Sequence, residues 1–171
     1  MISKIAHLLE TAVSQVRALA RGLSPVSAQP NGLMAALEAL AKQCSELFSV
    51  ECRLICPEPV LIEDNKMATH LYRIAQEAIN NAVRHGKARK IEIELFATKG
   101  QPALRVADNG IGFKKAAKEP KGMGLRTMNY RADLIGADFA ISKRPGHGTV
   151  VICSLRAQPT EWNGSGKDNH Q

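Results

Sequence analysis

Residues 90–113 have the sequence KIEIELFATKGQPALRVADNGIGF. Charged and apolar side chains alternate over residues 90–97, which predicts a strand with one face toward solvent. A turn is expected at residues 99–100, followed by a second strand over residues 103–107 that ends at Asp108. The stretch therefore predicts two adjacent strands that lead into an acidic, glycine-containing turn.

Helices and strands are expected on both sides of this pair of strands. Apolar periodicity and turn residues predict helices over 33–48, 65–85 and 125–135 and strands over 50–56, 138–142 and 149–155. Asp64 is expected to cap the second of these helices, and Gly86 to end it. The order predicts an α/β (α+β) two-layer sandwich with a mixed, mostly antiparallel sheet that helices cover on one face.

Composition excludes several classes of protein. With 171 residues, of which 44% are hydrophobic and 23% charged, the chain fits one domain with an appendage. The net charge of +7 suits a polyanionic ligand, while few aromatic residues and scattered charges disfavour nucleic acid. Without a long apolar run, no membrane contact is expected. Cys52 and Cys56 are expected to be small buried side chains in a reducing compartment, since no CxxC pair occurs.

Both ends of the chain are predicted to lie outside the sandwich. Residues 2–23 carry a heptad seam that predicts a helix packed on a partner helix, or alternatively on its own domain: Ile2, Ile5, Leu9, Ala12, Val16, Leu19 and Leu23. Residues 113–122 are polar and predict a mobile loop. The predicted division is a helix over 1–24, a linker over 25–32, a domain over 33–156 and a disordered tail over 157–171.

Three polar residues of the 65–85 helix form a candidate site. Glu77, Asn81 and His85 are spaced by four, so they share one stripe of the helix. A carboxylate and a carboxamide one turn apart can orient a water and bind a hard cation. Mg²⁺ keeps several waters, so one protein carbonyl plus phosphate oxygens would suffice. A solvated helix face is the alternative.

The turn after Asp108 is a second candidate. Gly110 and Gly112 permit positive φ and close approach of the backbone to a flat ligand. A buried carboxylate at Asp108 can accept a hydrogen bond from an exocyclic amine, which would select adenine over guanine. A β-turn without a ligand is the alternative.

The segment KGMGLRTMNYRA, residues 121–132, is a third candidate. Its helix is expected to begin near Leu125, and free N–H groups at that end favour an anion. The residues expected at this anion site are Lys121, Gly122, Gly124, Leu125 and Arg126. Thr149, at the start of the last strand, is expected near the base of the site. A helix with a flexible entrance is the alternative.

In this order the motifs resemble the GHKL ATP-binding superfamily, and within it the catalytic domain of bacterial sensor histidine kinases. The matching segments are QEAINNAVRHG at 76–86, DNGIGF at 108–113, GMGL at 122–125 and GHGT at 146–149. The resemblance covers residues 33–155 and implies a Bergerat-type sandwich that binds ATP and Mg²⁺. The seam helix with its connector is similar to the second dimerisation helix of the subfamily typified by nitrate and lipid-fluidity sensors.

The resemblance also implies roles for individual residues. Asn81 would coordinate Mg²⁺, and Glu77 would act as general base or position a water. Asp108 would bind the adenine amine, while Arg84 and His85 would approach the phosphates. The residues expected to bind ATP are Asn81, Arg84, His85, Asp108, Gly110, Gly112, Lys121, Gly122, Gly124, Leu125 and Thr149.

By the same resemblance, the chain is expected to be a cytoplasmic part of a sensor kinase that forms a homodimer through its N-terminal helix. Such a kinase transfers the ATP γ-phosphoryl group to a histidine and thence to a response-regulator aspartate. No HDxxxQ-like motif occurs, so the chain is expected to lack the phosphoacceptor. A membrane anchor elsewhere in the full-length protein stays open. The alternatives are a GHKL serine kinase of the anti-sigma-factor type and a non-catalytic nucleotide-binding module.

Overall fold

The computed structural model describes residues 25–98, 100–112 and 122–156. The predictions for helix 2–23, for most of the 113–122 loop and for the 157–171 tail lie outside these residues. The helices are α2 (Gly32–Phe48), α3 (Asn65–Arg84) and α4 (Met123–Leu134), and the strands are β1 (Glu51–Ile55), β2 (Lys90–Thr98), β3 (Gln101–Asp108), β4 (Ala137–Lys143) and β5 (Thr149–Leu155). The predicted order of these elements is confirmed. Within the described residues, no helix combines the length and the hydropathy of a membrane-spanning segment.

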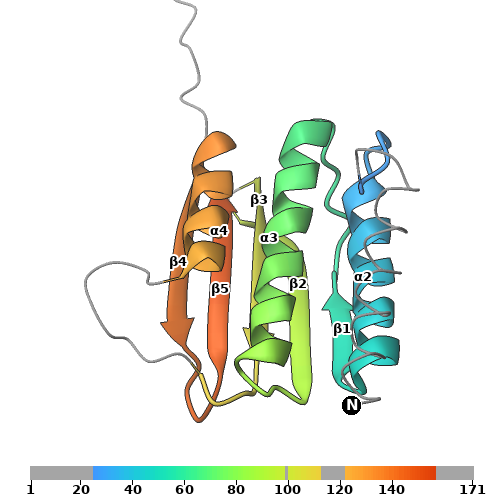
Figure 1. The fold of residues 1–171 in the computed structure, drawn as a ribbon. Helices are drawn as coiled ribbons and strands as arrows, with labels where there is room; N and C mark the ends of the chain where they lie inside the picture. Colours follow the sequence, from blue (N-terminus) through green and yellow to red (C-terminus); the bar gives the residue numbers. More distant parts are fainter. Residues whose placement is uncertain (1–24, 99, 113–121, 157–171) are drawn as a thin grey trace, which may run out of the picture.

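The five strands form one sheet in the order β1-β2-β3-β5-β4. β1 pairs with β2 in parallel, whereas the three other neighbouring pairs are antiparallel. All three helices lie side by side on one face of this sheet (Figure 1). The predicted two-layer α/β sandwich with a mixed, mostly antiparallel sheet is therefore confirmed.

Two helix starts show how local chemistry sets the boundaries. The Asp64 side chain accepts hydrogen bonds from the backbone N–H of Lys66 at 2.8 Å and of Met67 at 3.2 Å, as predicted for an N-cap. Helix α4 begins at Met123, earlier than the predicted Leu125. Its N-cap is Gly122 with φ 149°, a conformation that glycine adopts without a Cβ clash, so the chain enters the helix sooner.

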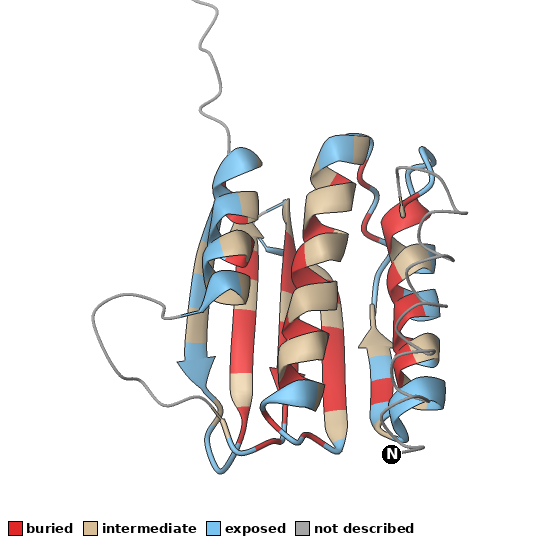
Figure 2. Ribbon diagram, viewed as in Figure 1, coloured by how far each residue is buried: buried red, intermediate tan, exposed pale blue. Residues whose placement is uncertain are grey.

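The core lies between the helices and the inner face of the sheet (Figure 2). Its largest fully buried side chains are Leu33, Leu37, Leu71, Ile74, Ile91, Ile93, Leu95, Leu104, Met128 and Cys153. The predicted linker contributes Val26, which is 2% exposed, and Pro30 accepts a hydrogen bond from the Ile62 N–H at 3.0 Å. This segment is therefore packed on the domain that follows it.

The cysteines are free thiols. Burial of Cys52 is as predicted, but the prediction that Cys56 is buried is wrong: β1 ends at Ile55, and the half-buried Cys56 follows it and donates to the Glu58 carbonyl. Burial also raises the pKa of the Cys153 thiol to about 12. The Cys153 thiol is therefore protonated at neutral pH.

The outer face of the sheet carries a buried carboxylate, Glu92, which is 8% exposed. Arg53 Nη2 lies 2.6 Å from its Oε1, and Arg144 Nη2 lies 3.1 Å from its Oε2. The hydrogen bond from Arg53, with the positive charge of Arg144 and Lys90, holds the pKa of Glu92 below its ordinary value. Arg144 follows the edge strand β4, so this pair ties the β4–β5 hairpin to the middle of the sheet.

Candidate functional site

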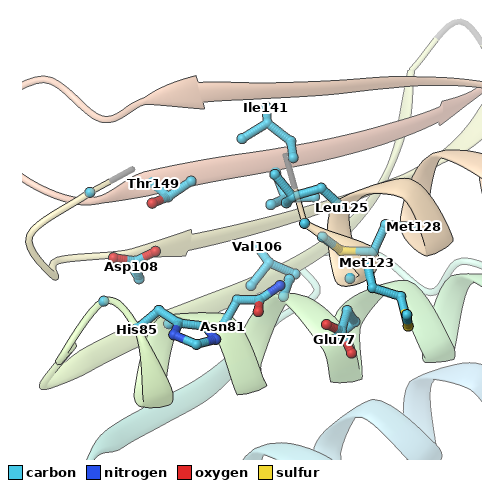
Figure 3. A pocket seen from close by; sticks show the side chains of 17 residues that line it. Glu77, Asn81, His85, Val106, Asp108, Met123, Leu125, Met128, Ile141 and Thr149 are labelled. Carbon is cyan, nitrogen blue, oxygen red and sulfur yellow. The ribbon is translucent and has the colours of Figure 1, made fainter. Parts of the chain in front are cut away.

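A cavity of about 580 Å³ lies where α3, α4 and the ends of β3 and β5 meet (Figure 3). Its size is typical of sites for small ligands, roughly 300–1,000 Å³. The predicted site residues that line it are Glu77, Asn81, His85, Asp108, Gly112, Gly122, Gly124, Leu125 and Thr149. All three candidate motifs and the start of the last strand therefore contribute to one cavity.

Helix α3 supplies one wall. Leu71, Ile74 and Ala75 have no exposed surface and hold the helix against the core. The stripe of Glu77, Asn81 and His85 then faces the cavity, as Figure 3 shows. The predicted stripe therefore lies at the same cavity as the other motifs. The alternative, a helix face exposed only to solvent, would not place it there.

Asp108 stands at the end of β3 and is only 6% exposed. Its Oδ1 accepts a hydrogen bond from the Gly110 N–H at 2.7 Å. A buried carboxylate is costly unless hydrogen bonds stabilise it. Since Oδ1 already accepts in the turn, Oδ2 is the oxygen with more capacity left to accept from a donor in the cavity that Asp108 lines.

Glycines allow three chain segments to meet around Asp108. A Cβ on Gly110 would lie 2.2 Å from the carbonyl oxygen of Gly86, at the end of the α3 segment. A Cβ on Gly148, in the β4–β5 hairpin, would lie 1.9 Å from the carbonyl oxygen of Asp108 itself. No residue with a side chain fits at either place without movement of the backbone, so these glycines set the shape of the turn.

The first turn of α4 forms the opposite wall of the cavity. A Cβ on Gly124 would lie 2.1 Å from Oε1 of Glu77 and 3.4 Å from Nδ2 of Asn81, so this turn lies directly against the α3 stripe. The turn has no side-chain cap. Its N–H groups and the positive end of its dipole therefore favour an anion beside Glu77 and Asn81.

Some predicted residues lie elsewhere. Arg84 is exposed at the end of α3 and is not among the described residues that line the cavity, so its approach to a phosphate stays a prediction. Gly110 is buried behind the turn, where it bonds Asp108, and Lys121 lies outside the described residues.

The apolar side chains of the cavity were not predicted from the sequence. Val106, Met128, Ile141 and Val151 line it together with the polar residues. The inward alternation of the strands was the available signal for three of them, but it does not distinguish core from cavity wall. These side chains provide a surface suited to a flat apolar ring.

The geometry agrees with a comparison against known protein families. Residues 67–159 match the family described as histidine kinase-, DNA gyrase B-, and HSP90-like ATPase. The chain belongs to this ATPase family. The predicted resemblance to the GHKL superfamily is confirmed, and with it the assignment as an ATP-binding domain.

Curated relatives place this GHKL domain among sensor histidine kinases of the nitrate-sensor type, as predicted. It is 36% identical over 134 residues to the nitrate/nitrite sensor protein NarQ of Escherichia coli, covering 77% of this chain and 23% of that protein. It is 30% identical over 171 residues to the sensor histidine kinase LiaS of Bacillus subtilis, covering 98% of this chain and 46% of that protein. The chain thus spans less than half the length of either relative.

Solved structures share the fold of this GHKL domain. The ATP binding domain of PrrB from Mycobacterium tuberculosis superposes with a TM-score of 0.61 at 20% identity, covering 77% of this chain and 96% of that one. The histidine kinase AdeS of Acinetobacter baumannii gives a TM-score of 0.60 at 14% identity, covering 90% of this chain and 79% of that one. At such identities the likeness establishes the fold alone.

Proposed function

We propose that this domain binds ATP with Mg²⁺ and catalyses phosphoryl transfer to a histidine of a sensor kinase, from which the group passes to a response-regulator aspartate. The bond between the γ-phosphorus and its bridging oxygen breaks, a bond to a histidine nitrogen forms, and ADP leaves. One observation carries the proposal: Asp108 and the Glu77–Asn81 stripe, far apart in sequence, line the same cavity. The names of the curated relatives support a histidine kinase over a serine kinase or a non-catalytic module.

The adenine is proposed to lie against Asp108. Its amine would donate to Oδ2, while Oδ1 stays bonded to the Gly110 N–H. Val106, Ile141 and Val151 offer an apolar surface for the ring. Thr149, at the start of β5, lines the same part of the cavity and would contribute a hydroxyl to the adenine end.

The phosphates are proposed to extend toward the first turn of α4. Gly122, Gly124 and Leu125 line the cavity there, and the N-terminal N–H groups of α4 favour the negative charge. Lys121, Arg84 and His85 are proposed to add positive charge around the phosphates.

The donor set fits Mg²⁺. Asn81 offers a carboxamide oxygen to the cavity, and hard oxygen donors are what this ion prefers. When bound, the ion would neutralise charge that develops on the phosphates. Asn81 would hold it, with water and phosphate oxygens as the remaining ligands.

Glu77 is proposed as the catalytic carboxylate. It lies beside Asn81 and against Gly124, at the end of the cavity where the phosphates are proposed to lie. From there it would accept a proton from the attacking histidine, or orient that histidine by a hydrogen bond.

The arrangement of the whole protein is also a proposal. Residues 33–156 would be the catalytic domain, joined by residues 25–32 to a helix that forms a homodimer. The seam of residues 2–23 supports this pairing because its spacing suits a helix bundle. A cytoplasmic location would give the domain access to ATP and to a response regulator.

Replacing Glu77 with Gln tests its role. In the full-length kinase, Glu77→Gln is expected to lower the rate of phosphohistidine formation by roughly 10²- to 10⁴-fold, because the amide cannot take a proton. The affinity for ATP is expected to stay within about threefold, since Glu77 is proposed to contact neither adenine nor metal. Acid-labile radioactive phosphate and calorimetry measure the two quantities.

The exposed Glu38 on α2 provides a matched control. Glu38→Gln makes the same chemical change away from the cavity and is expected to leave both quantities unchanged. A Glu77→Gln protein that autophosphorylates at the wild-type rate would assign Glu77 to structure.

A further inference from the structure

The exposed residue Asn109, next to Asp108, makes three hydrogen bonds to the start of β2. Its Oδ1 accepts from the backbone N–H of Arg89 at 2.9 Å and of Lys90 at 2.8 Å. Its own N–H donates to the carbonyl oxygen of Lys90 at 3.1 Å. The Asn109 side chain is thus hydrogen-bonded to the backbone at the start of β2, about twenty residues earlier in the sequence.

These bonds continue the pairing of β2 with β3 past its last regular step. The final pair of the ladder is Ile91 opposite Asp108. Beyond it the chain turns, so the Asn109 side chain takes the place of a backbone carbonyl. On the other side of the turn, the Ile111 N–H donates to the carbonyl oxygen of Gly86 at 2.8 Å. Asp108 and Gly110 therefore sit in a turn that is anchored at both ends.

Asn109 is not among the described residues that line the cavity. Its effect on a ligand would therefore be indirect, through the turn that carries Asp108. Without the Asn109 side chain, the N–H groups of Arg89 and Lys90 would turn to water, and before Gly110 only the backbone bond from the Asn109 N–H to the Lys90 carbonyl would remain to hold the turn. The Asp108 carboxylate would then sample orientations in which Oδ2 no longer points to one place in the cavity.

We propose that Asn109 is a positioning residue for nucleotide recognition. It holds the Asp108 carboxylate in the orientation that accepts a hydrogen bond from the adenine amine. This role rests on the proposed function of the cavity as an ATP site. The proposal divides the affinity for ATP into two parts. The contact with the adenine amine depends on the hydrogen bonds from the Asn109 side chain to Arg89 and Lys90, whereas the contacts with ribose, phosphates and Mg²⁺ do not.

The test compares ATP with purine riboside triphosphate, which lacks only the amine. The dissociation constants of both, with Mg²⁺, are measured by calorimetry on the chain and on Asn109→Ala. We expect the wild type to prefer ATP by about tenfold, the worth of one charge-assisted hydrogen bond. In Asn109→Ala, ATP is expected to bind about tenfold more weakly and the analogue within about twofold, so that the preference disappears.

Two further variants separate positioning from stability. Asn109→Asp keeps an acceptor for both N–H groups and is expected to retain most of the preference for ATP. Ser45→Ala is the matched control: Ser45 Oγ accepts from the Cys52 N–H at 3.0 Å and donates to the Cys52 carbonyl at 3.2 Å, a similar clamp between α2 and β1. It is expected to lower the unfolding temperature without changing the preference.

The outcomes are distinct. If Asn109→Ala keeps the wild-type preference, or weakens both nucleotides equally, Asn109 is only structural and the proposal is overturned. If Asn109→Ala does not fold, Asn109→Ser, whose hydroxyl is too short to reach both N–H groups, is judged by the same ratio. A wild-type chain that binds both nucleotides equally would instead overturn the proposed function, and this role with it.

Discussion

Asp108→Asn is expected to weaken ATP binding by about 1–3 kcal/mol, roughly 5- to 150-fold in dissociation constant. The carboxylate has two acceptor oxygens, and Oδ1 is already bonded to the Gly110 N–H at 2.7 Å. An amide at this position offers one acceptor, so either the turn or the adenine amine loses its partner. Calorimetric titration with a non-hydrolysable ATP analogue measures the effect.

Asp138 on the edge strand β4 is the control for this substitution. Its side chain is 72% exposed and pairs with Arg156 at 2.8 Å, outside the described lining of the cavity. Asp138→Asn is therefore expected to bind the analogue as the wild type does. An Asp108→Asn protein with wild-type affinity would show that Asp108 does not contact the nucleotide.

Gly148→Ala is expected to lower the free energy of unfolding by about 2–5 kcal/mol, the largest loss among the variants proposed. Gly148 has φ +108°, and its Cβ would lie 1.9 Å from the Asp108 carbonyl oxygen. Since backbone atoms cannot yield as a flexible side chain does, the hairpin and the turn must move apart. Denaturant unfolding measures the free energy, and ATP affinity is expected to fall with it because the turn carries Asp108.

The same hairpin contains a matched control. Gly146 also has positive φ, +91°, but a Cβ there would meet nothing within 4 Å. Gly146→Ala therefore carries the conformational strain without the overlap and is expected to cost only about 1–2 kcal/mol. Equal losses in the two variants would show that the contact between Gly148 and Asp108 does not hold the site together.

Much of the fold could be predicted because local signals agreed. The Asp64 side chain caps α3 as the sequence predicts, alternation identified β2, and the turn at 99–100 separated β3 from it. The start of α4 was placed too late, because glycine has low helix propensity and Gly122 and Gly124 were both assigned to the loop. In the structure only Gly122 lies outside the helix, where its backbone conformation begins α4.

The strand order could not be predicted from local patterns. The parallel pairing of β1 with β2 and the insertion of β5 between β3 and β4 depend on how the whole core packs. Glu92 illustrates the same point, since the alternating pattern of its strand predicts that it is exposed to solvent. Its burial to 8% exposure arises from arginines that come from β1 and from the β4–β5 hairpin.

The candidate site was predictable where a side chain's direction follows from its own element. Spacing by four placed Glu77, Asn81 and His85 on one stripe, and the end of a strand placed Asp108. Long-range contacts were not predictable in this way. The clamp from Asn109 to Arg89 and Lys90 spans about twenty residues and has no periodic signal.

Nucleotide selectivity tests whether the Asp108 carboxylate binds the adenine amine. Calorimetry with Mg²⁺ compares ATP with GTP on the unmodified chain. GTP presents a carbonyl oxygen where ATP presents the amine, so it would face the Asp108 carboxylate with an acceptor instead of a donor. We expect ATP to bind at least about tenfold more tightly than GTP. Equal affinity for the two nucleotides, or no binding of ATP, would show that this cavity is not an adenine site.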